Sequence, residues 1–369
     1  MAEATRISYL APVFEPAIGG GVVYVAILAR ELPARIAGSV FAVVTEAYPG
    51  SPAHETRADG KVEVHRVFPF RAGQSTRGVG AYVAYAMQNA QFFGLYRWLP
   101  RRGVLFVHGS FFNNPGAIWP ALRLVRRLRP HLRLILDLRD PKFPASLARK
   151  ANWFDATVSC SRNISARLPG VEHLWDIPVM IEQRHFDVDE LAAVLVRHRL
   201  EGRRYVFNGS GFNEGKGSSE LLELVREIRK RQPDIVLAVA GKRRHWTPAM
   251  ESAVREGWLL PLGIIASIDV RAISAASWLD ANLSRVDSFP RHSLEALASG
   301  ARVLLPAGVP EFADTCPEHI GDPGRGTSAL AEQAIAIADG TIGSCPYPWR
   351  QHLPDAVMAQ YVDLIASLH

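Results

Sequence analysis

Cysteines and long hydrophobic runs are both rare in this sequence, and their scarcity limits what the protein can be. The 369 residues include three cysteines, Cys160, Cys316 and Cys345, whose scattered spacing matches neither a metal site nor a disulfide framework. We therefore expect no disulfide framework and a reducing, cytoplasmic compartment. No stretch reaches the ~18 uninterrupted apolar residues of a membrane-spanning helix. The N-terminus also lacks the basic and apolar regions of a signal peptide.

Acidic residues are scarce in the first half of the chain. Residues 1–185 contain 13 Asp+Glu against 23 Lys+Arg, a formal charge of +10, whereas residues 186–369 contain 23 against 19, or −4. A basic first half suits an anionic partner such as a membrane surface, although a solvated arginine-rich surface explains the same count. Basic residues interleaved with stacking aromatics are absent, so we expect no nucleic-acid partner.

Short apolar runs alternate with amphipathic stretches along the first half. Five runs rich in Val, Ile, Leu and Phe are too short for helices and are predicted as strands. They cover residues 6–13, 39–45, 61–67, 103–109 and 132–138. Helical patterns lie between several of them, including one that follows Pro120, a residue suited to a first helical turn. The alternation predicts a doubly wound parallel sheet.

The pattern breaks over residues 177–202 and then starts again. New strand-like runs follow, with a helix predicted over 218–231 and another after Pro290. We therefore predict an α/β protein with two Rossmann-like, doubly wound domains, and we expect their sheets to face each other across a ligand-binding cleft. The predicted domains are residues 1–185 and 186–347, with a final helix at 348–369 that packs back on the first domain.

The stretch DSFPRHSLEALASG (287–300) has the features of a helix start that binds an anion. Pro290 suits the beginning of a helix, and Gly300 suits its left-handed cap. The first N–H groups of such a helix, near residues 289–292, carry a partial positive charge that can hold a phosphate, and His292 and Ser293 are among the candidate ligand-binding residues. Arg291 adds a full charge beside them.

Two acids accompany this helix. Glu295 can accept two hydrogen bonds from a vicinal diol such as ribose, and Asp287 can accept hydroxyls on another part of the ligand. A phosphate held between two sets of hydroxyls suits a nucleotide-sugar. The simpler alternative is an ordinary buried helix with a surface aspartate and a glutamate at its rim.

Two glycine-rich loops occupy matching positions, each between a strand and a helix. GSGFNEGKG (209–217) and AIGGGVVY (17–24) both allow a backbone to approach a ligand closely, and the first also brings a compact positive charge. One glycine-rich turn is weak evidence, because ordinary tight turns use glycine too. The candidate ligand-binding residues in these loops are Gly20, Gly21, Gly209, Ser210, Gly211 and Lys216.

Several motifs follow one another in an order typical of one enzyme family. FVHGSFF has that family's His-Gly strand end, GFNEGKG its Glu-Lys-Gly loop, and DSFPRHSLEALASGARVLLPAGVPEF its paired acids with seven residues between them. Over most of its length the chain thus resembles a family 4 glycosyltransferase of the GT-B architecture. The resemblance implies a retaining transfer of a sugar from a nucleotide-sugar donor to a hydroxyl acceptor, with no metal and no other cofactor.

The resemblance also implies roles for individual residues. Glu295 would hold the ribose, Asp287 would contact the hydroxyls of the donor sugar, and Lys216 would bind the diphosphate. His108 would lie near the reacting sugar, and the pair Gly20 and Gly21 near the phosphate and acceptor. Positive groups and a helix N-terminus would stabilise the departing diphosphate in place of a cation.

The chain departs from the family pattern at three places. The first acid is Asp287 where the family has glutamate. The arginine expected beside the lysine loop is replaced by Ser210 or Gly211, and the Asn-Gly-x-Asp motif has become Val179, Met180 and Glu182. We expect Arg291 to take over the missing diphosphate contact, ahead of Lys242 or Arg243. The same departures allow a second hypothesis, a non-catalytic subunit of glycosyltransferase type that binds a nucleotide, glycan or partner protein.

Other patterns have competing interpretations. DVD (187–189) looks like a metal-binding Asp-x-Asp but is better explained as a helix cap. Arg139 and Asp140 follow a strand and could face a ligand, although an ion pair that holds the loop is the favoured interpretation. FFGLYRWLPRR (92–102) combines aromatics with three arginines and suits either a membrane interface on the inner face or a helix packed on the first sheet.

Overall fold

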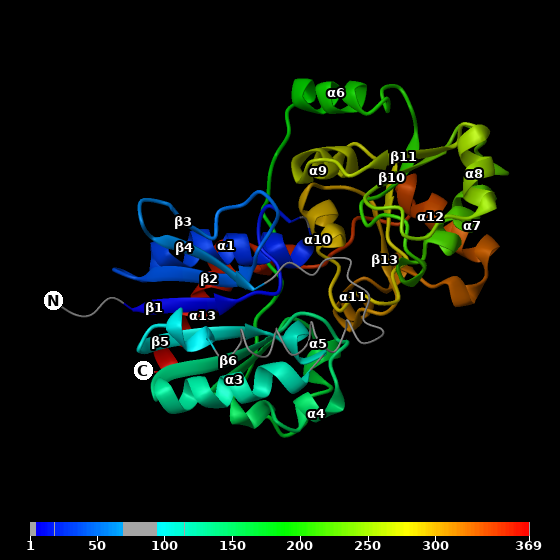
Figure 1. Ribbon diagram of the computed structural model, residues 1–369. Helices are drawn as coiled ribbons and strands as arrows, with labels where there is room; N and C mark the ends of the chain where they lie inside the picture. The colour runs from blue at the N-terminus through cyan, green and yellow to red at the C-terminus, as the bar shows by residue number, and fades with distance from the viewer. Residues whose placement is uncertain (1–4, 18, 69–93, 114, 369) are drawn as a thin grey trace. The chain divides into compact units, whose positions relative to one another are not determined.

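The computed structural model describes residues 5–17, 19–68, 94–113 and 115–368 (Figure 1). The chain divides into two compact units: a first unit of Met1–Met180 with Pro354–His369, and a second unit of Ile181–Leu353. The predicted domains change at residues 185/186 and 347/348, whereas the units change at 180/181 and 353/354.

The first unit is built on a sheet whose described strands run in the order β3-β4-β2-β1-β5-β6-β7-β8. All neighbours are parallel except β3 and β4, which are antiparallel. The strands are β1 (Arg6–Leu10), β2 (Val40–Glu46), β3 (His54–Arg57), β4 (Val62–Phe68), β5 (Arg102–His108), β6 (His131–Leu138), β7 (Ala156–Ser159) and β8 (Leu174–Asp176).

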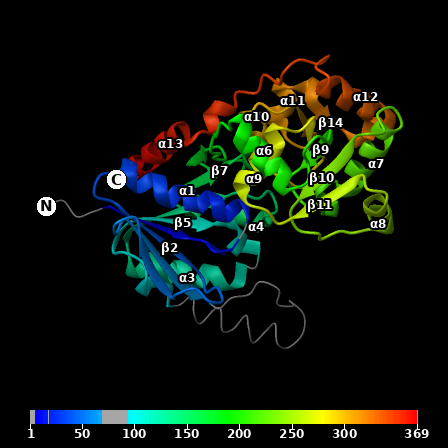
Figure 2. The ribbon, with the colours of Figure 1, turned by 90° about the horizontal axis from the view of Figure 1, so that it is seen from above.

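Helices cover both faces of this sheet, which explains why its central strands are apolar on both sides. Figure 2 shows α1 and α13 on one face and α3 on the other. The side chains of Ile7 and Tyr9 pack toward the first layer, and that of Leu10 toward the second. The helical segments are α1 (Gly20–Arg35), η1 (Leu95–Arg97), η2 (Gly109–Asn113), α3 (Pro115–Leu128), α4 (Ala145–Ala148), η3 (Ala151–Trp153), α5 (Arg162–Ser165) and α13 (Pro354–Ser367).

The C-terminal helix belongs to the first unit, as the amphipathic pattern suggested. Val357, Met358 and Leu364 of α13 are fully buried in the same apolar cluster as α1. The hydroxyls of Tyr24 and Tyr361 also contact each other between the two helices. The predicted helix over 348–369 is in fact two pieces, because Pro354 disfavours helical geometry at the residue before it.

The second unit contains a parallel sheet with the described order β11-β10-β9-β12-β13-β14. Its strands are β9 (Tyr205–Asn208), β10 (Val236–Ala240), β11 (Leu259–Gly263), β12 (Leu279–Ala281), β13 (Val303–Pro306) and β14 (Ile320–Gly321). Its helical segments are α6 (Val188–Arg197), η4 (Glu214–Lys216), α7 (Ser218–Arg229), α8 (Pro248–Arg255), α9 (Ser267–Ala275), α10 (Arg291–Ala298), α11 (Pro310–Thr315), η5 (Pro317–His319), η6 (Pro323–Arg325), α12 (Thr327–Ala338) and η7 (Trp349–His352).

Two Rossmann-like units of alternating strands and helices confirm the predicted α/β fold class. One local prediction was wrong: α3 begins at Pro115, so Pro120 lies inside the helix and not in its first turn. None of the described helices combines the length and apolar character needed to cross a membrane.

The expectation of no disulfide framework was also wrong. Cys316 and Cys345 form a disulfide in the second unit, with Cα atoms 5.7 Å apart, and Cys160 is a buried thiol outside this bond. The bond joins the end of α11 to the segment before η7. Beside it, the rings of Phe312 and Tyr347 meet edge to face with centroids 4.8 Å apart. Sequence spacing missed this pair because residues 29 apart can be neighbours only through the fold.

Candidate functional site

The residues singled out in the sequence fall into one group in each unit. In the second unit they come from the loops after β9 and β12 and from the start of α10, at the carboxyl edge of the parallel sheet. Open parallel sheets bind their ligands at this edge. In the first unit, His108 ends β5, while Gly20 and Gly21 open α1.

Close backbone approaches shape the loop between β9 and α7. A Cβ atom on Gly209 would lie 2.6 Å from the ring of His292. Gly217 has a φ of +72°, and a Cβ atom there would lie 2.4 Å from the carbonyl oxygen of Leu283. A side chain at either position would push the loop away from α10 or from the end of β12. The glycines therefore bring three segments of the chain to one place.

Lys216 and Asp287 face each other within this group of loops. Lys216 Nζ lies 3.5 Å from Asp287 Oδ1, and the two side chains are 31% and 23% exposed. The N–H of Arg285 donates to the carbonyl oxygen of Gly215 at 3.0 Å, which ties the loop after β12 to the lysine loop. The structure thus brings together a cation and a carboxylate that were predicted separately, and leaves both accessible to a ligand.

Arg291 and Glu295 form a buried pair in the first turns of α10. Arg291 Nη2 lies 2.8 Å from Glu295 Oε1, and the side chains are only 13% and 9% exposed. The two groups meet as an ion pair without the alignment of a hydrogen bond, and Arg291 Nε has no hydrogen-bond partner among the described residues. Buried charged groups without hydrogen bonds are costly to the folded state. A ligand with a phosphate and hydroxyl groups would supply the bonds that this pair lacks.

The start of α10 offers backbone donors as well. The first intrahelical bond runs from the N–H of Leu294 to the carbonyl oxygen of Pro290, and the preceding N–H groups have no helix carbonyl within reach. His292 and Ser293 supply two of these groups. The hydroxyl of Ser293 is 1% exposed and accepts a hydrogen bond from Asn282 Nδ2 at 3.0 Å. Ser293 therefore offers a ligand its backbone, while its side chain supports β12.

His292 links α10 to β12 and to the glycine loop. Its Nε2 lies 3.0 Å from Asp280 Oδ2 and 3.1 Å from the backbone nitrogen of Gly209. The two contacts exclude each other, because a ring nitrogen that donates its hydrogen has no lone pair for another N–H. Burial alone would lower the pKa of His292, but the carboxylate of Asp280 outweighs it and raises that pKa above its usual value. The charged ring donates to Asp280 and leaves the Gly209 N–H for a ligand.

The raised pKa of His292 predicts stability that is present in acid and lost in alkali. Below the unfolded pKa of 6.5 the ring is charged in both states, and its contact with Asp280 contributes in full; this contribution is lost as the pH rises through the folded pKa. We expect His292→Gln to lower the melting temperature more at about pH 6 than at about pH 9. Thermal unfolding of both proteins across this range measures the difference.

His319 provides a matched control for that experiment. Burial is the largest cause that lowers the pKa of His319, so the folded state favours the neutral ring. Protonation of this ring in acid therefore lowers the free energy of unfolding. His319→Gln should therefore lower the melting temperature more at about pH 9 than at about pH 6. If His292→Gln lowers the melting temperature equally at both pH values, or more in alkali, the raised pKa of His292 is contradicted.

Sequence reasoning missed the buried polar residues that support the site. Asp280 is 1% exposed and Asn282 is fully buried. Asn282 also accepts the N–H of Ser284 at 3.0 Å, at the start of the loop that carries Asp287. The available signal was an acid and an amide inside the apolar run WLDANL. Buried polar groups of this kind need partners, and the partners here are the site's own segments.

His108 lies at the end of β5 in the first unit. Its Nδ1 is 2.8 Å from Ser110 Oγ and accepts the N–H of Ser110 at 3.2 Å. In the neutral form the ring proton is therefore on Nε2. Burial lowers the pKa of His108, which keeps the ring neutral at neutral pH. Gly20 and Gly21 are exposed, and a Cβ atom on either would meet nothing within 4 Å.

Arg139 has a structural role, although its partner differs from the expected one. Its Nε donates to Asp137 Oδ1 at 2.7 Å, and its Nη2 donates to the hydroxyls of Tyr24 and Tyr361. Asp140 instead accepts a hydrogen bond within its own loop. The expected ion pair between Arg139 and Asp140 was therefore wrong, because Arg139 pairs with Asp137 of β6. The pair ties β6 to α1 and α13.

The DVD stretch caps α6. The N–H of Glu190 donates to Asp187 Oδ1 at 2.7 Å, and the Glu190 side chain accepts the N–H of Asp187, which completes a capping box. The helix-cap interpretation is confirmed. Within the described ranges, no group of three or more His, Cys, Asp or Glu residues is arranged to hold a metal ion.

Some sequence predictions lie partly or wholly outside the described residues. From the sequence, acceptor contacts are expected in variable loops such as residues 47–60 and 70–80; residues 70–80 are outside the described ranges, and so are the first two phenylalanines of FFGLYRWLPRR. From residue 94 onward, Leu95 and Leu99 are buried, while Trp98 is 45% exposed. The described part of this segment therefore packs its leucines on the first sheet and leaves one aromatic ring at the surface.

The fold is shared with solved glycosyltransferases of the GT-B architecture. Sucrose-phosphate synthase from Thermosynechococcus elongatus superposes with a TM-score of 0.72 at 16% identity, covering 99% of each chain. A UDP-forming α,α-trehalose-phosphate synthase from Burkholderia xenovorans, solved with glucose-6-phosphate, has a TM-score of 0.69 at 11% identity and covers 98% of this chain and 99% of its own. HepE from Anabaena, solved with UDP and glucose, has a TM-score of 0.65 at 15% identity, covering 98% and 100%.

These likenesses establish the fold and do not extend to the sequence. A scan against protein-family models finds no match, and neither does a search of curated protein sequences. At such low identity, the residues of the site have to be argued from their own geometry.

Proposed function

We propose that this protein is a retaining glycosyltransferase that moves a sugar from a nucleotide-sugar donor to a hydroxyl acceptor without a metal ion. The observation that carries the proposal is the group formed by Lys216, Asp287, Arg291 and Glu295 in the second unit. It combines two cations with two carboxylates at a sheet edge that suits ligands, and its buried pair lacks hydrogen bonds. The fold shared with a UDP-forming synthase supports the same class of reaction.

The donor's diphosphate would bind where positive charge is concentrated. The N–H groups at the start of α10 carry about half a positive charge, and Lys216 and Arg291 add full charges. As the bond to the sugar breaks, negative charge develops on the diphosphate. These positive groups would stabilise that charge, a role that a metal cation has in other enzymes. Arg291 lies on the α10 side of the site and takes the place of the arginine that the glycine loop lacks.

The two carboxylates would hold the ends of the donor. Glu295 would exchange part of its contact with Arg291 for two hydrogen bonds from ribose hydroxyls. Asp287 would accept hydrogen bonds from hydroxyls of the sugar. Lys216 would lie between Asp287 and the phosphates. The bond from the sugar carbon to the diphosphate breaks, a bond to the acceptor oxygen forms on the same face, and the acceptor's proton passes to the leaving phosphate. Neutral His108 in the first unit would donate a hydrogen bond from Nε2 to a sugar oxygen.

A non-catalytic glycosyltransferase-like subunit is the second candidate. It is favoured by the Ser210–Gly211 stretch where the diphosphate arginine is expected, and by Met180, which stands in the altered Asn-Gly motif and is fully buried. Tight nucleotide binding without transfer to any acceptor would support this candidate. Turnover by the isolated chain would exclude it.

Partners and location follow as further proposals. We expect a nucleotide-sugar donor and a hydroxyl-bearing acceptor, with the arginine-rich first unit able to contact an anionic membrane surface. A cytoplasmic location stays a proposal. The Cys316–Cys345 disulfide counts against a cytoplasmic location, because cytosolic thiols keep most protein cysteines reduced.

The proposed activity is tested by incubating the protein with a panel of nucleotide-sugars, UDP-sugars first, in the presence of EDTA. We expect one donor to raise the melting temperature and to be hydrolysed slowly, and we expect the anomeric configuration of its sugar to be retained in any transfer product. Lys216→Ala should reduce both effects, because it removes a charge that faces the diphosphate. A panel in which no nucleotide-sugar and no nucleoside diphosphate shifts the melting temperature would refute the proposal.

A further inference from the structure

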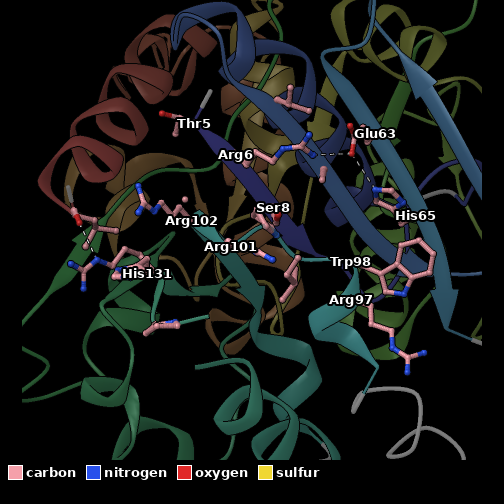
Figure 3. Close-up of a pocket in the computed structure, with 18 residues that line it drawn as sticks. Thr5, Arg6, Ser8, Glu63, His65, Arg97, Trp98, Arg101, Arg102 and His131 are labelled. Atoms are coloured by element: carbon pink, nitrogen blue, oxygen red, sulfur yellow. Dashed lines mark hydrogen bonds and ion pairs between the residues drawn. The ribbon is translucent and has the colours of Figure 1, made fainter. Parts of the chain in front are cut away.

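A pocket lies in the first unit, at the amino ends of its strands and thus at the opposite edge of the sheet from His108. Its volume is about 940 Å³. Alternate residues of three neighbouring strands line it, with Arg6 and Ser8 from β1, Val40 and Ala42 from β2, and Glu63 and His65 from β4. Residues two apart in a strand share one face of the sheet. The segment Arg97–Gly103 and residues near the start of β6 complete the lining (Figure 3).

The pocket is strongly basic. Among the described residues that line it, five are arginines and one, Glu63, is acidic, which gives them a formal charge of +4 with the histidines neutral. The lining arginines are Arg6, Arg97, Arg101, Arg102 and Arg133. Glu63 Oε2 lies 3.5 Å from Arg6 Nη1, so the single acid is already engaged. Guanidinium groups present paired donors that match the oxygens of a phosphate.

A buried hydroxyl in the same pocket lacks a partner. Ser8 is fully buried, and its Oγ makes no hydrogen bond within the described parts of the chain. A buried hydroxyl without a partner is unfavourable unless a ligand completes it. The wall beside it is held close by Gly103, whose φ is +117° and where a Cβ atom would lie 2.0 Å from the carbonyl oxygen of Arg6. This glycine lets the arginines at the starts of β1 and β5 line one hollow.

One rim of the pocket is amphipathic. Trp98 is 45% exposed, and its ring lies 5.3 Å from that of His65. Arg97 and Arg101 flank it in the sequence and are exposed. A surface tryptophan beside exposed arginines suits the boundary between a charged headgroup and an apolar chain.

We propose that this arginine pocket binds the phosphate group of an anionic ligand, at a site separate from the proposed donor site in the second unit. The basic lining attracts the anion, the guanidinium groups bind its oxygens, and Ser8 Oγ donates the hydrogen bond that it otherwise lacks. A phospholipid headgroup and a soluble phosphorylated compound share this chemistry, and Trp98 at the rim favours the lipid.

The test uses the full chain and two phosphate sources. One arm titrates inorganic pyrophosphate by calorimetry at low ionic strength, where charge interactions are least screened. The other arm measures flotation with vesicles of phosphatidylcholine alone and of phosphatidylcholine mixed with phosphatidic acid. We expect Arg101→Glu to weaken binding about tenfold or more, since it replaces a charge-assisted bond by repulsion. Arg123→Glu is the matched control, because Arg123 is exposed on α3 and outside the pocket.

Ser8→Ala separates a binding role from a structural one. It removes a hydroxyl that has no partner in the protein, so the melting temperature should not fall, while phosphate binding weakens severalfold. Saturable binding of pyrophosphate that Arg101→Glu weakens and Lys216→Ala leaves intact identifies a soluble ligand of this pocket, and binding only to vesicles with phosphatidic acid identifies a lipid. Absence of binding in both arms, or equal losses in Arg101→Glu and Arg123→Glu, overturns the proposal. Arg101→Glu should leave the melting shift with nucleotide-sugars intact, so this test stands apart from that of the transferase activity.

Discussion

Replacing Glu295 by alanine is expected to weaken nucleoside diphosphate binding at least about 100-fold. The reason is that Glu295 would accept two hydrogen bonds from ribose hydroxyls, and bonds to a charged group contribute about 1.5–3 kcal/mol each. The substitution also leaves Arg291 buried without its carboxylate, only 13% exposed. Calorimetric titration of the nucleoside diphosphate into both proteins measures the loss. Glu295→Gln, which keeps the shape, should retain part of the affinity.

Asp287→Asn is the matched comparison, because it removes the other carboxylate of the site. Asp287 would contact the sugar and not the nucleotide, and it lies 3.5 Å from Lys216. Its loss should therefore leave nucleoside diphosphate affinity unchanged or slightly higher, while turnover of the nucleotide-sugar falls. Equal losses of nucleoside diphosphate affinity in the Glu295 and Asp287 variants would contradict this division of roles.

Cys345→Ser is expected to lower the free energy of unfolding of the second unit by about 3.5 kcal/mol. The Cys316–Cys345 bond closes a loop with a sequence separation of 29, and a constraint of that length restricts the unfolded chain by about this amount. In a unit of this size the melting temperature should fall by about 10 °C. Cys345 is the better position to replace, because Cys316 is 2% exposed and a hydroxyl there would be buried.

Reductant provides the control for the disulfide. It should lower the melting temperature of the wild-type protein by a similar amount and leave Cys345→Ser unchanged. Alkylation after denaturation should label a single thiol, that of Cys160, in the unreduced protein. Labelling of all three cysteines, or an equal response of both proteins to reductant, would show that the bond does not form.

Much of the fold could be predicted because its signals are local. Runs such as VLFV (104–107) are apolar on both faces, which is typical of a strand covered by helices on both sides. The alternation of such runs with helical patterns then specifies a parallel sheet. The strand β3 and the short β8 and β14 escaped prediction, since HETR, LWD and IG carry too little apolar character or length. Among the described strands, these three pair only with strands already formed beside them, namely β4, β7 and β13.

The candidate site was predictable only as far as single motifs extend. The paired acids and the lysine loop can be found from sequence spacing, and the structure brings Lys216 to within 3.5 Å of Asp287. Long-range partners cannot be found in that way. The contact of His292 with Asp280, the pairing of Arg139 with Asp137 and the Cys316–Cys345 bond depend on tertiary geometry. So does the arginine pocket, whose lining comes from strands that are distant in sequence.

The central claim is that amide dipoles and Lys216, and not a divalent ion, neutralise the diphosphate of the donor. Calorimetric titration of a nucleoside diphosphate, with EDTA and then with magnesium, into wild-type protein and Lys216→Ala tests it most directly. We expect equal wild-type affinity in both buffers and a loss of about tenfold or more in Lys216→Ala. Binding that requires magnesium, or that is unaffected by the loss of Lys216, would contradict it.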